Sequence, residues 1–260
     1  MKVKVDGISL NYELTGKGKT LTLVHGMGDN LHLWDNQVPV FSKRYQVLRF
    51  DTRGFGQSDI PKQGYTYEDL SKDVYGLLKA LNIKETYLAG FSMGGVIVQR
   101  VALDYPQMVK GLIIVSSASQ TNQQAEERYL QRAKAAEEGG MVAIATELER
   151  RFYPGFLQKN PDFLNKYREQ FLSNNPRGWA LAARAMSRYN CTEELARIKC
   201  PTLVIVGEND ISVGVGGSVI MSRRIPGAQL KIVKECGHDI AREQPEEFNA
   251  AVLEFLASVK

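Results

Sequence analysis

The sequence Gly-Phe-Ser-Met-Gly at residues 90–94 places a serine between two glycines, a spacing typical of a nucleophilic serine. A short apolar run at residues 86–89 precedes it directly, and a helical pattern follows it. A sharp turn from strand to helix would hold Ser92 in a strained backbone conformation, and neighbouring backbone would pass too close to the glycines for a Cβ. The start of the helix would direct N–H groups at the serine oxygen. The pattern therefore predicts that Ser92 is a nucleophile.

A serine hydroxyl needs a base to accept its proton, and the chain has three histidines. His25 follows an early apolar run, and His32 comes a few residues later, where we expect the protein surface. His238 follows the last apolar run, at residues 230–233, and precedes the final helical pattern. Open α/β sheets bind their ligands at the carboxyl ends of the strands. His238 is therefore the predicted base.

A carboxylate should hold the other ring nitrogen of this histidine. Asp210 follows the apolar run at residues 203–206, and so it too lies at the carboxyl end of an expected strand. Its place in the chain, after the serine and before the histidine, is the order expected for this type of turn. Glu208 is the nearby alternative. Asp239 adjoins the base in sequence and is poorly placed to orient it.

Two backbone N–H groups are needed to stabilise the oxyanion of an acyl-transfer reaction. Met93, directly after the serine, is expected to supply one of them. The second is expected from the loop that follows the first buried run, where we favour Met27 and keep Gly28 as the alternative. The side chain of His25 would then hold this loop in place and take no part in the reaction.

These residues lie between short apolar runs and helical patterns. The chain opens on a predicted hairpin over residues 2–14 with its turn at Asp6 and Gly7. The apolar runs that follow lie at residues 21–24, 46–50, 86–89, 112–115, 203–206 and 230–233. The clearest helical patterns lie at residues 66–81, 92–105 and 244–259. This alternation predicts an α/β fold with a mostly parallel central sheet and helices on both faces.

Residues 120–199 interrupt the alternation because they contain no strand-like run. Helix-forming residues dominate the stretches 123–138 and 140–151, so we expect a helical insertion over the end of the sheet. Most of its many large side chains should form the core of the insertion, and a few should line a binding pocket. The candidates for the pocket are Tyr129, Phe152, Trp179 and Met186.

Composition excludes several classes of protein. The 260 residues include 33 Lys and Arg against 29 Asp and Glu, and the pair Arg150 and Arg151 is interpreted as a solvated surface and not as part of a nucleic-acid site. Three cysteines without a Cys-x-x-Cys spacing argue against a disulfide framework and a structural zinc site. The first residues carry no apolar run of signal-peptide length, and no later run is long enough to span a bilayer. We expect a cytoplasmic protein with no membrane partner.

These motifs, together with Asp-Thr-Arg-Gly-Phe-Gly-Gln-Ser-Asp at residues 51–59, closely resemble the α/β-hydrolase superfamily. The resemblance implies an α/β-hydrolase core at residues 1–119 and 200–260 and a helical cap, or lid, at residues 120–199. It also implies that Asp51 and Arg53 brace the turn beside the site without taking part in the chemistry. Many members have a Val-Pro step after the acid, whereas residues 211–217 of this chain are rich in glycine.

The nucleophile narrows the activities that the resemblance implies. Haloalkane dehalogenases and epoxide hydrolases use an aspartate at this turn, so Ser92 argues against both. Similar sequences with serine include small carboxylesterases, enol-lactone hydrolases and acyl-homoserine lactone hydrolases. We therefore expect a serine hydrolase that cleaves a carboxylic ester or lactone through an acyl-enzyme on Ser92, with no metal and no organic cofactor. A compact cap with many aromatic residues suits a mostly apolar acyl chain or a small ring.

Two alternatives keep the same three residues. One is a carbon–carbon bond hydrolase of ring-cleavage products, and the other is a cofactor-free perhydrolase. An alternative of another class is a small-ligand receptor with vestigial hydrolysis, which the presence of every expected catalytic residue argues against. The expected partner is a small-molecule ester or lactone, with no nucleic acid, and the expected assembly is a monomer or a small homo-oligomer.

Overall fold

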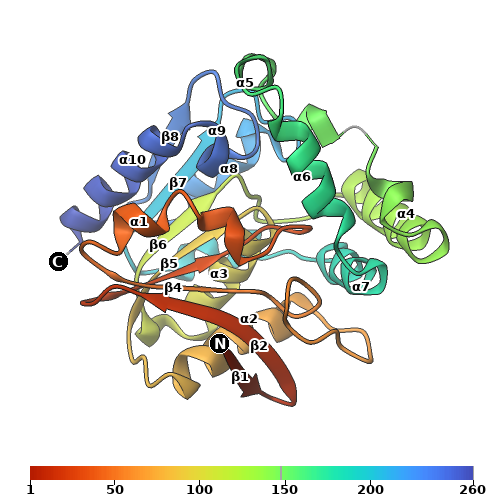
Figure 1. Ribbon diagram of the computed structural model, residues 1–260. Helices are drawn as coiled ribbons and strands as arrows, with labels where there is room; N and C mark the ends of the chain where they lie inside the picture. Colours follow the sequence, from red (N-terminus) through yellow and green to blue (C-terminus); the bar gives the residue numbers. More distant parts are fainter. Residues whose placement is uncertain (147, 260) are drawn as a thin grey trace.

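The computed structural model describes residues 1–146 and 148–259 of the chain. Its strands form one sheet of eight in the order β1-β2-β4-β3-β5-β6-β7-β8 (Figure 1). Their bounds are β1 Lys2–Val5, β2 Ile8–Thr15, β3 Thr20–Val24, β4 Gln46–Phe50, β5 Thr86–Phe91, β6 Val109–Val115, β7 Thr202–Gly207 and β8 Gln229–Val233. The pairs β1–β2 and β2–β4 are antiparallel, and the other five pairs are parallel. The predicted mostly parallel sheet is confirmed.

The register of the parallel strands brings their carboxyl ends to one edge of the sheet. Val24 at the end of β3 pairs with Gly90 near the end of β5, and Val115 at the end of β6 pairs with Ile205 near the end of β7. Every residue of β3 and β5 is buried, as expected for strands covered on both faces. The loops that follow these strands therefore meet at the same edge.

Helices cover both faces of the sheet (Figure 1). On one face α2 (Tyr67–Ala80), α3 (Met93–Asp104) and α8 (Gly214–Arg224) contribute to the larger core. On the other face α1 (Val38–Phe41) and α10 (Pro245–Ser258) contribute to a second core, in which Trp34 stacks on Phe248 with ring centroids 6.0 Å apart. The prediction of helices on both faces is confirmed.

Local sequence explains where one predicted helix begins and why another was missed. Thr66 precedes α2 and its backbone N–H donates to the Asp69 carboxylate over 3.0 Å, so a capping box begins the helix that the sequence predicts over residues 66–81. In contrast, α8 begins at Gly214 inside the glycine-rich stretch at residues 211–217, where the sequence predicts no helix. Residues 140–151 hold the two 3₁₀ turns η3 (Met141–Ile144) and η4 (Leu148–Arg151) around residue 147, which lies outside the described residues.

Residues 120–199, called the helical insert below, lie between β6 and β7. Their α-helices are α4 (Gln123–Gly139), α5 (Pro154–Lys159), α6 (Phe163–Leu172) and α7 (Pro176–Met186), and the 3₁₀ turn η5 (Thr192–Arg197) follows. Figure 1 shows α4, α6 and α7 gathered at one side of the sheet. Helices α4 and α7 pack against each other, and Gly178 of α7 approaches Gly54 so closely that a Cβ on Gly178 would lie 2.3 Å from the Gly54 carbonyl oxygen.

None of the helices in the described ranges, 1–146 and 148–259, combines the length and the apolar character needed to cross a membrane. Compartment and assembly state are separate properties of the molecule. The cytoplasmic location and the monomer or small homo-oligomer therefore stay predictions from the sequence.

Candidate active site

Ser92 occupies the sharp turn between β5 and α3. Its backbone has φ of +54° and ψ of −113°, a conformation that is strained for any residue with a side chain. A Cβ on Gly94 would lie 2.2 Å from the carbonyl oxygen of Val24, and a Cβ on Gly90 would lie 2.2 Å from that of Gly94. The Ser92 N–H donates to the carbonyl of Val115 over 2.9 Å. The glycines thus let three stretches of backbone pass closely enough to hold the strained serine.

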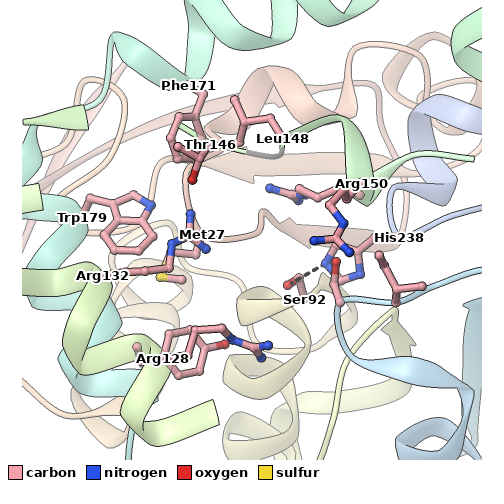
Figure 2. Close-up of a pocket in the computed structure, with 14 residues that line it drawn as sticks. Met27, Ser92, Arg128, Arg132, Thr146, Leu148, Arg150, Phe171, Trp179 and His238 are labelled. Carbon is pink, nitrogen blue, oxygen red and sulfur yellow. Dashed lines mark hydrogen bonds between the residues drawn. The ribbon is translucent and has the colours of Figure 1, made fainter. Parts of the chain in front are cut away.

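The structure brings Ser92, His238 and Asp210 together in one hydrogen-bonded chain. The Ser92 Oγ lies 3.1 Å from Nε2 of His238, as the dashed line in Figure 2 marks. Nδ1 of the same ring lies 2.8 Å from Oδ2 of Asp210. With the ring proton on Nδ1, the imidazole donates to Asp210 and accepts from the serine hydroxyl. His238 is 2% exposed and Asp210 is 4% exposed, so little solvent competes for these contacts.

Asp210 is held as a carboxylate. Burial by itself would raise its pKa, but the charge of His238 and the hydrogen bonds from its ring and from the N–H groups of Val213 and Ser212 outweigh burial. The pKa of Asp210 therefore lies below its usual range. Its Oδ1 accepts from Ser212 over 2.8 Å and from Val213 over 3.2 Å, which leaves Oδ2 directed at the histidine.

The two rival carboxylates are engaged elsewhere. The Glu208 side chain is exposed, and it accepts from the N–H of Glu235 over 3.4 Å. The Asp239 carboxylate accepts from Arg242 over 2.5 Å. Neither is hydrogen-bonded to the ring of His238, so Asp210 is the acid that the geometry favours.

The other two histidines have different environments. His25 is buried, its Nε2 accepts from the N–H of Thr52 over 2.9 Å, and its Nδ1 lies 2.7 Å from the carbonyl oxygen of Gly26. Burial lowers the pKa of His25, so the ring is neutral and both nitrogens hold the surrounding loops. His32 is exposed on the surface, as expected, with its Nδ1 3.3 Å from Asp35.

Asp51 and Arg53 brace the turn beside the site. Asp51 accepts from the N–H groups of Leu31 and Gln57, each over 2.8 Å. Arg53 forms two hydrogen bonds to Asp73 of α2, of 2.5 and 2.6 Å. Both side chains are thus committed to structural contacts, as the family resemblance implies.

The residues expected to stabilise an oxyanion flank Ser92. Met93 is the first residue of α3, and Met27 lies in the loop after β3 and lines the cavity above the serine. Among the described residues, no turn, loop or side-chain group accepts a hydrogen bond from the N–H of Met27 or of Met93. The helical insert holds the Met27 loop, because the carbonyl of Gly28 accepts from the side-chain amides of Gln170 and Asn174 over 3.0 and 2.9 Å.

A cavity of about 660 Å³ opens at Ser92 and His238 between the sheet and the helical insert (Figure 2). The residues that line it are Met27, Ser92, Arg128, Tyr129, Arg132, Thr146, Leu148, Arg150, Arg151, Phe171, Trp179, Ile211, Ser212 and His238. Two of the predicted pocket residues, Tyr129 and Trp179, are among them. A third, Met186, lines an adjoining cavity of about 310 Å³ that also reaches Ser92.

The fourth candidate for the pocket, Phe152, lines neither of these two cavities. Its ring packs edge-on against Phe163 and Tyr167 with centroids 4.9 and 5.0 Å away, and it is buried. Aromatic packing within the helical insert therefore accounts for this residue, because the side chain points into the core of the insert.

The cavity is more basic than the mostly apolar pocket expected from the sequence. Four arginines line it, and the described lining residues include no aspartate or glutamate. Arg150 and Arg151, interpreted from the sequence as a solvated surface, both belong to this set. Arg128 and Arg132 are spaced by one turn of α4, so their side chains lie on the same face of this helix.

The loop that carries His238 is fastened by residues that the sequence did not single out. The carboxylate of Glu243, in α9 (Ile240–Glu243), accepts from the N–H groups of Gly237 and Asp239 over 2.8 and 3.0 Å. It also accepts from the N–H of Tyr153 in the helical insert over 2.8 Å. The N–H of His238 itself donates to the carbonyl of Arg151 over 2.7 Å. The histidine loop and the insert are therefore tied together.

Comparison with known proteins agrees with this geometry. The family model described as alpha/beta hydrolase fold matches residues 19–245. This chain belongs to the α/β-hydrolase family. Among curated relatives of this α/β hydrolase, 3-oxoadipate enol-lactonase 2 of Acinetobacter baylyi is 31% identical over 248 residues, which cover 94% of this chain and 92% of the relative.

Two solved structures extend the likeness. The enol-lactonase of Burkholderia xenovorans has a TM-score of 0.94 and 29% identity. The match covers 99% of the chain described here and 100% of the enol-lactonase chain. A thermophilic esterase of Thermogutta terrifontis, solved with malate bound, has a TM-score of 0.95 and 31% identity, with coverage of 100% and 99%. The α/β hydrolase is thus a hydrolase that acts on ester bonds, the class that its sequence motifs predict.

Proposed function

We propose that this α/β hydrolase cleaves a carboxylic ester or lactone through an acyl-enzyme on Ser92. The observation that carries the proposal is the chain of contacts from Ser92 Oγ through the His238 ring to Asp210, at 3.1 and 2.8 Å. As Oγ attacks the acyl carbon, Nε2 of His238 takes the hydroxyl proton, and Asp210 stabilises the resulting imidazolium.

Collapse of the tetrahedral intermediate breaks the C–O bond of the ester, and His238 returns the proton to the leaving oxygen. In a lactone the leaving hydroxyl stays attached to the acyl group, so one molecule remains covalently bound to Ser92. A water molecule, deprotonated by His238, then attacks the acyl carbon. The products are a carboxylate and free Ser92, and the net reaction consumes one water.

The N–H groups of Met93 and Met27 stabilise the oxyanion in this proposal, with Gly28 as the alternative to Met27. The position of Met93 at the first turn of α3 supports its role, because the first N–H groups of a helix have no partner within the helix. Met27 is supported by its place at the wall of the cavity that contains Ser92.

The helical insert acts as a cap over the cavity in this proposal, with residues 1–119 and 200–260 as the catalytic core. Tyr129, Phe171 and Trp179 of the insert line the cavity together with Ser92 and His238, which supports a role in substrate binding. An enclosing cap also excludes bulk water from the acyl-enzyme and strengthens its electrostatic contacts.

The test is the Ser92→Ala variant, assayed on 4-nitrophenyl esters and γ-lactones of graded chain length. Turnover should fall by about a millionfold, the size of effect that removal of a serine nucleophile has in a catalytic triad. Labelling by a fluorophosphonate should also be lost.

Ser222→Ala is the matched control, because the Ser222 hydroxyl bonds the carbonyl of Val219 within α8. This variant should keep both turnover and labelling. Full esterase activity in Ser92→Ala would refute the acyl-enzyme. Stoichiometric labelling of the native protein without turnover on any ester or lactone would favour a receptor instead.

A further inference from the structure

Two arginines of α4 project into the cavity that contains Ser92. Arg128 and Arg132 are four residues apart, so their side chains share one face of the helix. Both line the cavity, and Figure 2 shows their guanidinium groups turned into it. Like charges at this spacing destabilise a helix, so the arrangement has a cost that some other interaction should offset.

Nothing within the described part of the chain neutralises these two charges. Arg132 donates to the carbonyl of Ile144 over 3.0 Å, and its guanidinium lies over the ring of Trp179 at 5.1 Å, but neither partner is an anion. Residues 1–146 and 148–259 supply no carboxylate that pairs with Arg128 or Arg132. Burial, together with the charges of Arg151 and Arg128, lowers the pKa of Arg132, which is the sign of a cation in a partly desolvated, positive environment.

Other arginines with little exposed side chain in this protein are paired. Arg53 forms its two hydrogen bonds to Asp73, and Arg242 pairs with both Asp29 and Asp239, at 2.9 and 2.5 Å. Arg132, which is half-buried, departs from this pattern at the place where the substrate must bind, and the exposed Arg128 lies one turn before it. A partly buried cation is costly unless an anion neutralises it, and a bound substrate is the group that enters this cavity.

A third arginine adds to the positive potential without competing for the same anion. Arg151 lines the cavity, but its guanidinium is hydrogen-bonded to the Tyr167 hydroxyl and lies 4.0 Å from the Asp29 carboxylate. The fork of donors on a guanidinium matches the two oxygens of a carboxylate. On the other walls, Leu148, Phe171 and the ring of Trp179 offer apolar contacts to the carbon skeleton of a ligand.

We infer that Arg128 and Arg132 bind a carboxylate carried by the substrate, so that the preferred substrates are small esters or lactones bearing a free acid group. The inference rests on the proposed function of Ser92 and goes beyond it by assigning the charge of the substrate and the residues that recognise it. Hydrolysis then releases a second carboxylate, and the product carries one more negative charge than the substrate.

The test compares two esters with the same acyl length and leaving group, mono-4-nitrophenyl adipate and 4-nitrophenyl hexanoate. The native enzyme should have a higher kcat/KM for the anionic ester than for the hexanoate. Arg128→Gln and Arg132→Gln should each lower kcat/KM for the anionic ester about tenfold or more, mainly through KM, because a charge-assisted hydrogen bond is lost. The hexanoate should change by less than about threefold, since its acyl chain has no charge to bind.

Arg223→Gln is the matched control, because it removes the same charge from the exposed surface of α8. It should leave the ratio of the two kcat/KM values unchanged. A native enzyme that shows no preference, or α4 variants that affect both esters equally, would overturn the carboxylate site and leave the role of Ser92 intact. If Ser92→Ala retained activity instead, the proposed function would fail.

A binding measurement keeps the inference testable without turnover. Adipate at millimolar concentration should raise the Tm of the Ser92→Ala variant, because a ligand that binds the folded state stabilises it. The shift should disappear when Arg132→Gln is added and persist when Arg223→Gln is added. Equal shifts in the Tm of both double variants would overturn the site. The absence of a shift in both double variants, or in Ser92→Ala itself, would also overturn it.

Discussion

At the scale of single residues, the site depends on side chains whose roles are fixed by a few hydrogen bonds. Asp210 has one oxygen committed to two backbone N–H groups and the other to His238. His25 is equally buried, yet its two nitrogens are occupied by Thr52 and Gly26. Two buried histidines therefore differ in function because their hydrogen-bond partners differ, and not because of burial.

Asp210→Asn should lower kcat by about 10⁴-fold, because an amide donor beside Nδ1 favours the wrong ring tautomer. Glu208→Gln, which changes an exposed neighbour on the same loop, should leave kcat unchanged. Steady-state kinetics on a 4-nitrophenyl ester measures both. Equal kcat values for Asp210→Asn and the native enzyme would remove Asp210 from the catalytic chain.

The same variant should change how stability depends on pH. The pKa of Asp210 is depressed in the folded state, so its ionised form stabilises the fold above the ordinary pKa of an aspartate, and this contribution is lost as the pH falls through the folded-state pKa. The difference in unfolding free energy between the native protein and Asp210→Asn should therefore be larger at neutral pH than in acid. Urea titrations at several pH values measure it, and a difference that grows on acidification would contradict the assignment.

At the scale of elements, short strands and helix caps were predictable because their signals are local. The capping box at Thr66 and the buried run of β5 are both visible in the sequence, and both elements form as predicted. Helix α8 was not predictable, because it begins at Gly214 in a glycine-rich stretch that intrinsic propensity assigns to a loop. Its first turn follows Ser212 and Val213, whose N–H groups donate to the carboxylate of Asp210.

The sequence did not predict the charge of the cavity or the contacts that hold the histidine loop, because both depend on segments that are far apart in the chain. The loop is held by Glu243, which lies next to it in sequence, but also by the distant Arg151 and Tyr153 of the helical insert. Only the packed insert brings these groups together. The local motifs predict Ser92 as the nucleophile and His238 as the base, whereas the substrate pocket depends on contacts between elements far apart in the chain.

Glu243→Gln should loosen the histidine loop from the insert. A glutamine side chain has one acceptor oxygen and an amide donor, so it cannot accept from all three N–H groups of Gly237, Asp239 and Tyr153. Leaving a buried N–H unpaired costs about 1–3 kcal/mol, so the unfolding free energy should fall by about that amount. Because His238 is displaced, kcat should fall more than KM rises.

Glu246→Gln, in the exposed first turn of α10, is the control and should match the native enzyme in both measurements. Urea unfolding and steady-state kinetics on a neutral ester distinguish the two variants. A Glu243→Gln variant with native kcat would show that the insert does not position His238.

At the scale of the whole molecule, the reactivity of the three cysteines measures whether the helical insert and the sheet open together or separately. All three are free thiols, and they lie in separate places: Cys191 precedes η5 within the helical insert, Cys200 precedes β7, and Cys236 adjoins the histidine loop. Burial raises the pKa of Cys191 to about 12 and that of Cys200 to about 11, and it also raises the pKa of Cys236. Each thiol is therefore protonated at neutral pH, and thiolate chemistry at all three sites is suppressed.

The native protein should react very slowly with a thiol reagent such as 5,5′-dithiobis(2-nitrobenzoic acid) at about pH 8, and all three thiols should react after unfolding in urea. If the insert and the sheet unfold as one unit, the three thiols should become reactive at the urea concentration at which the circular dichroism signal of the folded protein is lost. Mass spectrometry of quenched samples locates the modified residues. Early labelling of Cys191 alone would show instead that the insert opens while the sheet stays folded, and the contacts from Glu243 and Arg151 would then be too weak to couple the insert to His238.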